Sequence, residues 1–332
     1  MRIAEPNEGE EEEKMRKLAA LCTLLLAAAT AGAQPWPAKP IRLIVNFPPG
    51  GAADQIARLV APPVGEALGQ PVVVENRPGA NGNIGAEAVA KSPPDGYTLL
   101  MSSGGAFSAN PHLYTKLPFD PLKDLEPIAA AARISVFLVV KPDLPAKSVD
   151  ELVALARASP GKLTYGSPGS GSSPHIATAM FARAAGVQVT HIPYKGAAPA
   201  LTDLLGGQLD FMFDPGIGLG QVRAGKLRLL AVGSPKRSPL FPDVPTVAET
   251  GMVGFDADSW FGFYAPAGLP AEIAARLNRE LNRALQTPAV RDRILAIGGE
   301  PVALTAAEFA EVQRKDRERF GVVIRAAGIR LD

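Results

Sequence analysis

The stretch Phe47-Pro48-Pro49-Gly50-Gly51-Ala52-Ala53-Asp54 decides the fold, because it joins an apolar strand to a helix. Residues 41–46 (IRLIVN) are rich in β-branched side chains that suit a buried strand, and residues 55–60 (QIARLV) carry apolar residues at helical spacing. The two glycines leave the first N–H groups of the helix open to close approach. Such a helix start favours a carboxylate or phosphate, although a plain turn with Asp54 in the first helical turn fits equally well.

The order of strand, glycine-containing turn and helix recurs along the chain. Alternation of this kind predicts an α/β protein with mostly parallel sheets flanked by helices. Pro62 and Pro63 fall inside the first helix and predict a kink or an early stop there. Further strands are predicted at 71–76, 97–101, 134–140, 163–165, 187–192, 209–213, 226–232 and 259–266, and further helices at 86–91, 148–158, 176–185, 199–205, 270–286, 288–297 and 305–327.

Three helix starts are built from Gly, Ser and Pro: residues 47–54, residues 166–175 (GSPGSGSSPH) and residues 193–198 (PYKGAA). The first lies in one α/β block, and the other two lie in a second block that opens near Arg133. Two blocks that face each other across a cleft would hold a small anion largely by backbone N–H groups and bury it by hinge closure. Ser103 follows a predicted strand and is expected at the same end of the sheet, where ligands bind in open α/β sheets.

The first 33 residues have the pattern of an export signal. Residues 15–17 (MRK) are basic, residues 18–29 are apolar but too short to span a bilayer, and residues 31–33 (AGA) form a small-x-small cleavage site. An acidic run at 10–13 is wrong for such a signal and favours a start at Met15, although the sequence leaves Met1 open. Cleavage after about Ala33 would remove Cys22, the single cysteine, and place the mature protein in the periplasm. We expect domain 1 at 34–133 plus 262–332 and domain 2 at 134–261.

Charge and motif patterns exclude several function classes. The net charge of the chain is +1 and its basic residues are scattered, which makes nucleic acid a poor partner. Residues 220–226 (GQVRAGK) fit the spacing of a phosphate-binding loop, but Leu227 replaces the required Ser or Thr and the motif precedes a strand. His112, His175 and His191 are too dispersed to predict a metal site, and no G-x-G-x-x-G run occurs. We therefore expect neither a cofactor nor a metal.

Several residues keep two interpretations at this stage. A hydrolase using Ser170 with His175 is an alternative, although the chain has no G-x-S-x-G motif, and His175 could instead pack at the helix start. Lys195 could pair with a carboxylate or lie along apolar surface, while the N–H of Gly196 is the better placed donor. Tyr194 suits a cleft wall or a core, and Asp214 suits a ligand ammonium or a turn cap. A third class, a protein-interaction module without a small ligand, also stays open.

Segments along the whole mature chain resemble the Bug-type receptors of tripartite tricarboxylate transporters, a family of periplasmic binding proteins. Each segment is weak alone, but together and in this order they are specific: 36–41 (WPAKPI), 47–54, 72–86 (VVVENRPGANGNIGA), 95–99 (DGYTL), 169–175, 191–196 (HIPYKG), 203–210 (DLLGGQLD), 223–232, 241–246 (FPDVPT) and 265–270 (APAGLP).

The resemblance implies a non-enzymatic, monomeric receptor of the two-domain type II-like class, with a ligand cleft between the domains. Such a receptor takes up a small carboxylate or related molecule and passes it to a membrane permease. The ligand's identity stays undetermined, because backbone donors recognise charge and size more than identity. With the glycines of the helix starts included, the expected ligand-binding residues are Phe47, Gly50, Gly51, Ala52, Asp54, Ser103, Ser167, Gly169, Ser170, His175, Tyr194, Lys195, Gly196 and Asp214.

Overall fold

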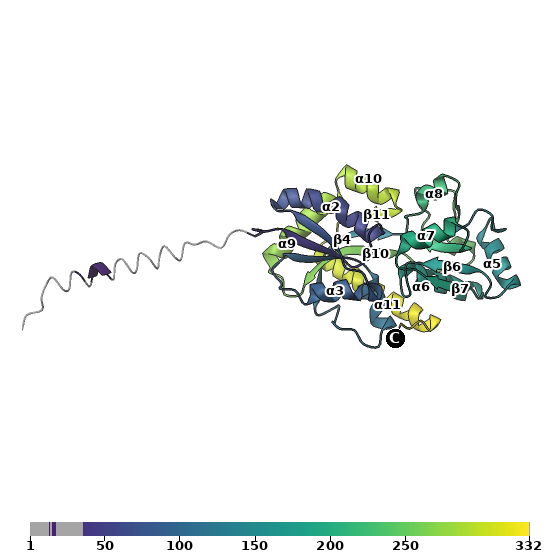
Figure 1. Cartoon of the computed structure of the whole chain (residues 1–332), viewed down its shortest axis with the longest axis horizontal. Helices are drawn as coiled ribbons and strands as arrows, with labels where there is room; N and C mark the ends of the chain where they lie inside the picture. Colours follow the sequence, from purple (N-terminus) through teal and green to yellow (C-terminus); the bar gives the residue numbers. More distant parts are fainter. Residues whose placement is uncertain (1–12, 14, 18–35, 332) are drawn as a thin grey trace, which may run out of the picture. The chain divides into compact units, whose positions relative to one another are not determined.

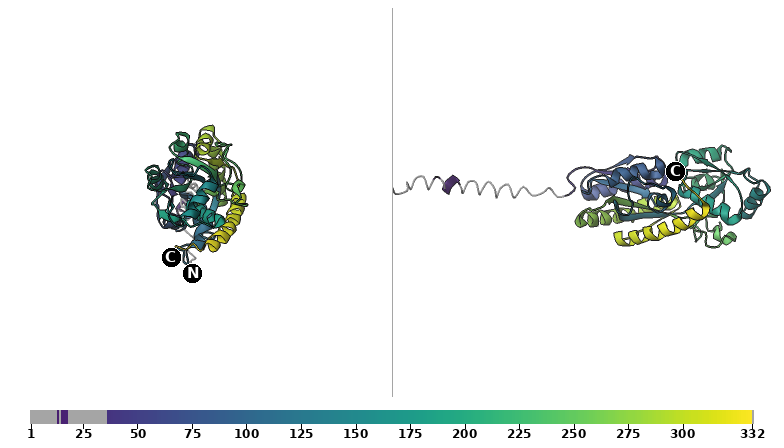
Figure 2. Two further views of the ribbon diagram at one scale, coloured as in Figure 1. Left: turned by 90° about the vertical axis from the view of Figure 1, so that its right-hand side faces the viewer. Right: turned by 90° about the horizontal axis from the view of Figure 1, so that it is seen from below.

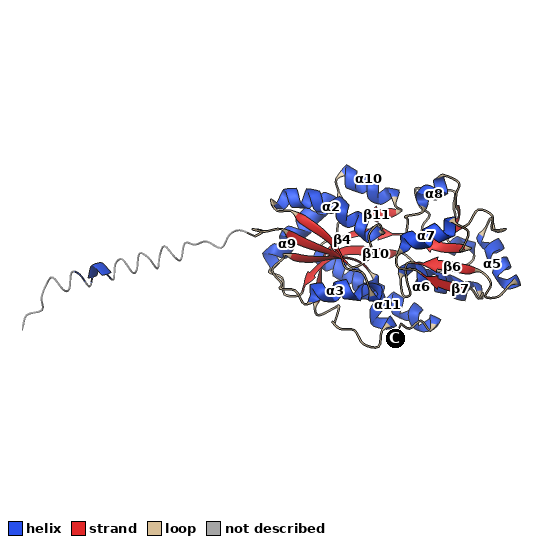
Figure 3. Cartoon of the chain, in the orientation of Figure 1, coloured by secondary structure: helices blue, strands red, loops and turns tan. Residues whose placement is uncertain are grey.

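The computed structural model describes residues 13, 15–17 and 36–331 (Figure 1). The predicted cleavage site and Cys22 lie outside these residues. The chain from Lys39 onward forms one compact unit, in which two β-sheets are covered by helices (Figure 3). In the described part, no helix is both long enough and apolar enough to cross a bilayer.

The first sheet has six strands in the order β11-β4-β10-β3-β1-β2. Strands β1, β2, β3 and β4 run in one direction, because β1 pairs parallel with β2 and β3, and β10 pairs antiparallel with both β3 and β4. Strand β11 pairs antiparallel with β4. The bounds are β1 Ile41–Val45, β2 Val72–Asn76, β3 Thr98–Ser103, β4 Leu125–Ile134, β10 Ser259–Pro266 and β11 Gly299–Pro301.

The second sheet has five strands in the order β7-β6-β8-β5-β9. Strands β6, β7, β8 and β9 share a direction, and β5 runs against its neighbours β8 and β9. Both sheets are therefore mixed, although four strands of each agree in direction as the sequence predicts. Three strands, β5, β10 and β11, are reversed, and the chain enters β5 and β10 on passing from one sheet to the other. The bounds are β5 Phe137–Val140, β6 Thr164–Ser167, β7 Thr190–Pro193, β8 Phe211–Asp214 and β9 Arg228–Val232.

The helices begin close to where the sequence places them. The predicted early stop at Pro62 and Pro63 is wrong, because α2 contains both prolines and continues to Leu68. Val60, Val64 and Leu68 are buried at helical spacing along one face of α2. Their packing offsets the backbone hydrogen bonds that the two prolines cannot make. The bounds are α2 Ala52–Leu68, α3 Asn83–Ala90, α4 Asn110–Leu113, α5 Val149–Ala158, α6 Ser173–Ala185, α7 Ala197–Leu205, α8 Leu219–Arg223, α9 Ala271–Leu285, α10 Pro288–Ala296 and α11 Ala306–Ala327.

Three strands, β4, β5 and β11, differ from the prediction. Residues 134–140 do not form one strand, because β4 ends at Ile134 and β5 begins at Phe137 after a short crossing between the sheets. Strand β4 itself was not predicted, since its alanines at 129–132 lack the alternation of a half-buried strand, and all four are fully buried. The short strand β11 was also missed in a region predicted to hold only helices.

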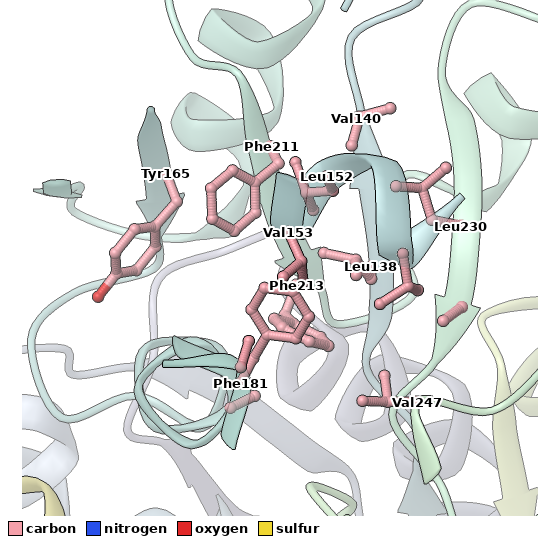
Figure 4. Packing of buried hydrophobic residues seen from close by; sticks show 14 of the residues in the cluster. Leu138, Val140, Leu152, Val153, Tyr165, Phe181, Phe211, Phe213, Leu230 and Val247 are labelled. Atoms are coloured by element: carbon pink, nitrogen blue, oxygen red, sulfur yellow. The ribbon is translucent and has the colours of Figure 1, made fainter. Parts of the chain in front are cut away.

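Each sheet packs its own apolar core. The core of the five-stranded sheet places Leu138, Phe211 and Phe213 against Leu152 of α5 and Phe181 of α6 (Figure 4). In the core of the six-stranded sheet, the rings of Phe107 and Tyr264 stack with centroids 3.7 Å apart. Helix α9 packs on β4 and α2, which confirms that the C-terminal helices return to the first sheet. The exact domain boundaries stay a prediction.

Helix α11 connects the two halves of the unit. Thr305 caps it, accepting a hydrogen bond from the N–H of Glu308 while the Glu308 side chain accepts from the N–H of Thr305. Figure 2 shows the helix running from the first sheet toward the second. Near its end, Phe320 and Ile324 pack in one apolar cluster with Leu113 of α4 and Ile176 of α6. The start of α6 is thus seated on elements of the first sheet.

Candidate functional site

A cavity of about 160 Å³ lies between elements of the two sheets. Its lining comes from the starts of α2, α6 and α7, the end of β3, and the two crossings between the sheets near β4 and β10. The lining residues are Phe47, Pro48, Pro49, Gly51, Ala52, Ala53, Asn81, Ser103, Gly105, Ile134, Val136, Pro168, Ser172, Ser173, Pro174, Lys195, Gly196, Ala197, Ala198, Pro199, Pro215, Ser259 and Phe261.

The start of α2 forms one wall of the cavity. Gly51 is the N-cap, with φ −75° and ψ 169°, and no side chain caps this end. Asp54 is buried behind it and accepts hydrogen bonds from the N–H of Gly50, from Arg58 and from Asn76, each at 2.9 Å. Burial disfavours the Asp54 charge, but these hydrogen bonds outweigh it and hold the pKa of Asp54 below its usual value. Asp54 therefore shapes the turn and does not face the cavity.

The starts of α6 and α7 form the opposite wall. Their N-caps are Ser172 and Gly196, and neither helix has a side-chain cap hydrogen bond. Gly196 has φ 123°, which a residue with a Cβ rarely adopts. Its N–H donates to the Pro168 carbonyl at 3.1 Å, so the prediction that this N–H is the better placed ligand donor is wrong. Helices α9 and α10 also lack side-chain caps, so an uncapped start alone identifies no site. The informative feature is that three uncapped starts, from both sheets, line one cavity.

The remaining lining is mostly apolar. Phe47, Phe261, Ile134 and Val136 supply hydrocarbon surface, together with prolines from both halves of the unit. Among the described lining residues, Lys195 is the single cation and no side chain is acidic. Orphan N–H groups attract anions, whereas a ligand ammonium would find no carboxylate partner here. The cavity is suited to a small anion with an apolar body.

Six of the fourteen predicted residues line the cavity: Phe47, Gly51, Ala52, Ser103, Lys195 and Gly196. The others lie outside its lining: Gly50, Asp54, Ser167, Gly169, Ser170, His175, Tyr194 and Asp214. The structure brings the three predicted helix starts together. However, it places most of the predicted polar side chains behind the wall, where they hold the turns that carry the N–H groups.

Asp214 and Tyr194 act on the protein itself. Asp214 is fully buried, and its Oδ2 accepts hydrogen bonds from the N–H groups of Gly216 and Gly218, both at 2.9 Å. Burial raises the pKa of Asp214 to about 7, although these hydrogen bonds oppose the rise. The capping interpretation of Asp214 thus fits, and the ammonium interpretation does not. The Tyr194 hydroxyl donates to Asp203 at 2.6 Å, and its ring packs against the core beside β8.

His175 and His191 form a stacked pair behind the start of α6. Their ring centroids are 4.1 Å apart, and the Tyr165 ring lies 4.8 Å from that of His191 and 6.4 Å from that of His175. His175 Nδ1 accepts a hydrogen bond from the Gly171 N–H at 2.9 Å, and His191 Nε2 lies 2.7 Å from the Ser167 hydroxyl. Burial lowers the pKa of each histidine to about 4, and for His175 the neighbouring His191 adds to the effect. Both rings are therefore neutral at pH 7.

We predict a pH dependence of stability from the His191 ring. Because its folded pKa is about 4 and its unfolded pKa about 6.5, its contribution is complete above pH 6.5 and is lost as the pH falls toward 4. Asp214 acts in the opposite direction, since its raised pKa makes acidification stabilising between pH 7 and 4. The comparison must therefore be made with a His191→Gln variant, which leaves Asp214 in place.

The measurement is chemical denaturation of both proteins between pH 7.5 and 4. We expect the free energy of unfolding of the wild type, minus that of His191→Gln, to shrink steadily below pH 6.5. A difference that does not change with pH would show that His191 has an ordinary pKa in the folded protein.

Sequence reasoning missed part of the lining. Ser172 and Ser173 lie inside a segment that the sequence singles out, but the resemblance implies Ser170 and His175 there, and the helix begins at Ser173 and not at the predicted Ile176. Ile134, Val136 and Ser259 come from the crossings between the sheets, whose position depends on the unpredicted strand β4. Asn81 lies in a glycine-rich turn, and only its unusual backbone, described below, sets it apart.

The two sheets, the crossing strands and the cavity lined by helix starts define the class of periplasmic binding proteins. The sequence profile of the tripartite tricarboxylate transporter family receptor matches residues 56–329, and the chain belongs to this family. The protein BugT of Bordetella pertussis is 40% identical over 324 residues, which are 96% of this chain and 99% of BugT.

Solved structures agree with this assignment. The R. palustris protein determined with adipate is 36% identical, with a TM-score of 0.85 over 89% of this chain and 99% of that one. The periplasmic binding protein BugD is 34% identical, with a TM-score of 0.84 over 89% of this chain and 99% of that one. MatC from Rhodopseudomonas palustris, with bound malate, is 32% identical, with a TM-score of 0.82 over 87% of this chain and 100% of that one.

Proposed function

We propose that the protein is a periplasmic receptor that captures a small organic carboxylate in this cavity by closing around it, and delivers it to a tripartite tricarboxylate-type permease. The observation that carries the proposal is the convergence of the α2, α6 and α7 starts on one cavity. Orphan N–H groups and helix dipoles stabilise an anion there without a dedicated cationic pocket. Export, the monomeric state and the permease partner rest on the signal-like N-terminus and on the family.

The proposed binding residues follow the cavity lining. Backbone N–H groups at Gly51, Ala52, Ser173 and Ala197 hold carboxylate oxygens, while Ser103 supplies a hydroxyl. The Lys195 side chain is exposed and adds a cation at the rim. Phe47 and Phe261 contact the carbon chain of the ligand. Adipate and malate, the ligands of two relatives, have this combination of terminal carboxylates and a short carbon body.

No observation favours the hydrolase alternative. Because Nδ1 of His175 accepts the Gly171 N–H, the neutral ring carries its proton on Nε2, and neither nitrogen is available as a base for Ser170. Ser167 does lie within hydrogen-bond distance of His191, but Ser167 is fully buried and outside the cavity lining. A nucleophile must reach its substrate, and neither serine is placed to do so.

A thermal-shift screen against mono-, di- and tricarboxylates, aromatic acids and amino acids tests the proposal. A carboxylate at about 100 times its dissociation constant should add roughly 2.7 kcal/mol of stability. Because none of the described residues that line the cavity is acidic, adipate should stabilise the protein more than 2-aminoadipate. Mass spectrometry of the incubated mixtures should find no product. Absence of stabilisation by every compound, in protein shown by mass spectrometry to carry no co-purified ligand, would contradict the proposal.

A further inference from the structure

The turn before α3 has an unusual backbone. Gly79, Ala80, Asn81 and Gly82 have consecutive positive φ angles of 130°, 47°, 50° and 90°. Ala80 and Asn81 are the non-glycine residues with positive φ in the described part of the chain. Most residues with a Cβ avoid this conformation, and asparagine is one of the few that adopt it readily, so the strain falls on Ala80 and persists where surrounding contacts enforce it. Asn81 lines the cavity, so this strained turn lies at the candidate site.

A network of asparagines enforces the turn from the side of the first sheet. Asn81 Nδ2 donates to Asn110 Oδ1 at 2.6 Å, and Asn110 Nδ2 donates back to the Asn81 carbonyl at 3.0 Å. Asn110 is fully buried and also donates to Asn83 Oδ1 at 2.6 Å. Asn46 holds the end of the turn through the Gly82 carbonyl at 3.0 Å. The position of Asn81 is thus fixed by its neighbours.

From this position Asn81 reaches the other half of the unit. Its Nδ2 also donates to the carbonyl of Gly171, at 3.0 Å, in the loop that leads into α6. The orientation of the Asn81 amide is determined, because exchanging its nitrogen and oxygen would set its oxygen against the Gly171 carbonyl. Both N–H groups of the amide are therefore engaged, one with Asn110 beside the first sheet and one with Gly171 in the loop that leads into α6.

Close packing accompanies this hydrogen bond. A Cβ at Gly171 would lie 2.6 Å from Leu331 Cδ1, 2.8 Å from Leu113 Cδ1 and 3.0 Å from Asn81 Nδ2. The absence of a side chain lets the Gly171 backbone approach the first sheet's elements. On the other side, the Gly171 N–H donates to His175, which anchors the loop to α6. The peptide groups of Gly171 thus link the Asn81 turn to the helix start that lines the cavity.

We propose that Asn81 is a positioning residue that holds the start of α6 in its ligand-binding orientation and thereby slows release of the bound carboxylate. This proposal rests on the proposed function for the identity of the ligand. Without the Asn81 amide, the 169–173 loop keeps only the hydrogen bond from the Ser173 hydroxyl to Ser259 Oγ of β10, at 3.2 Å, as a polar tie to the first sheet's side, and its N–H groups spend less time aimed into the cavity. The association rate should change little, because the cavity, Lys195 and the helix starts remain.

The test compares Asn81→Gly with a matched control, Asn278→Ala. Glycine suits the positive φ of residue 81 and removes only the side chain, so folding is retained. Asn278 on α9 also donates its amide to two acceptors, the backbone carbonyls of Ile128 and Leu304, but lies outside the cavity lining, and alanine suits its helical backbone. Each variant therefore loses one asparagine amide with two acceptors, at the cavity or away from it.

The first readout needs no ligand. Hydrogen exchange followed by mass spectrometry should show faster exchange in peptides covering residues 167–176 for Asn81→Gly and unchanged exchange for Asn278→Ala. The second readout is stopped-flow release of adipate, or of the best carboxylate in the thermal-shift screen. Loss of one hydrogen bond predicts dissociation roughly five- to tenfold faster for Asn81→Gly, with an association rate within about twofold of the wild type.

The outcomes separate the two proposals. If hydrogen exchange at residues 167–176 is as slow in Asn81→Gly as in the wild type, the positioning role is wrong, whichever ligand binds. Faster exchange with an unchanged dissociation rate would overturn the link to release. A wild-type protein that binds no carboxylate would contradict the proposed function, while the exchange experiment would still decide whether Asn81 positions the loop.

Discussion

Replacing Arg319 by alanine is expected to lower the free energy of unfolding by about 3 kcal/mol, because it leaves buried charge without a partner. The Arg319 guanidinium lies 2.6 Å from Asp316 Oδ1 and 3.0 Å from Asp256 Oδ1. It also donates to the carbonyls of Asp256 and Asp258, in the segment that returns the chain to β10. The Asp316 side chain is only 5% exposed, so water cannot replace the donor that it loses, whereas the Asp256 side chain is 28% exposed.

The control for this prediction lies on the same helix. Arg314 makes equally short ion pairs with Glu311 and Glu318, but its side chain is 57% exposed. Exposed ion pairs contribute little, so Arg314→Ala should leave the unfolding curve almost unchanged. Guanidinium denaturation of the two variants makes the comparison. Equal and small effects would mean that the Arg319 network does not hold the crossing segment.

Replacing Gly216 by alanine is expected to weaken both folding and carboxylate binding. A Cβ at Gly216 would lie 1.8 Å from the Ile297 carbonyl oxygen, and its φ of 94° adds backbone strain. The turn after β8 must then move away from α10, and Pro215 in this turn lines the cavity. We expect a loss of stability of about 3 kcal/mol from overpacking and strain together. Carboxylate affinity should fall by about tenfold or more, the effect of losing roughly 1.4 kcal/mol.

Gly254→Ala separates strain from overpacking. Gly254 has a similar φ of 80°, but a Cβ there would meet nothing within 4 Å. This variant should lose only about 1 kcal/mol and bind carboxylate like the wild type. Denaturation curves and calorimetric titrations of the two variants test the prediction. Wild-type affinity in Gly216→Ala would show that the contact between Gly216 and Ile297 is not needed for the binding-competent arrangement.

The sequence predicts local features of this fold well where a single mechanism dominates. The turn at 47–54, the Ser148 cap of α5 and the strand at 259–266 are confirmed, because each has a clear pattern in its own local sequence. Strand β4 escaped prediction because its alanines are buried on both faces and carry no alternating pattern. Helix α2 passes through Pro62 and Pro63 because tertiary packing outweighs a local preference.

The candidate site shows the same limit. Glycines and serines at helix starts indicated where a ligand would sit, and three of these starts line one cavity. Sequence patterns could not show which side chains face it. Asp54, Asp214 and His175 each turn back to hold a nearby backbone N–H, an arrangement that depends on side-chain direction. Asn81 could not be singled out, because its importance comes from a carbonyl 90 residues away.

The most direct test of the central claim is calorimetric titration of adipate, or of the best carboxylate in the screen, into Gly51→Val and Gly220→Val. Gly51 lines the cavity with an ordinary φ of −75°, and a Cβ there comes no closer than 3.6 Å to the protein. A valine at this position should fold but block close approach to the α2 start. Gly220 is exposed on α8, outside the cavity lining. We predict that Gly51→Val loses at least about tenfold in affinity, equivalent to 1.4 kcal/mol, and that Gly220→Val does not. Equal wild-type affinity in both folded variants would contradict the assignment of the cavity as the carboxylate site.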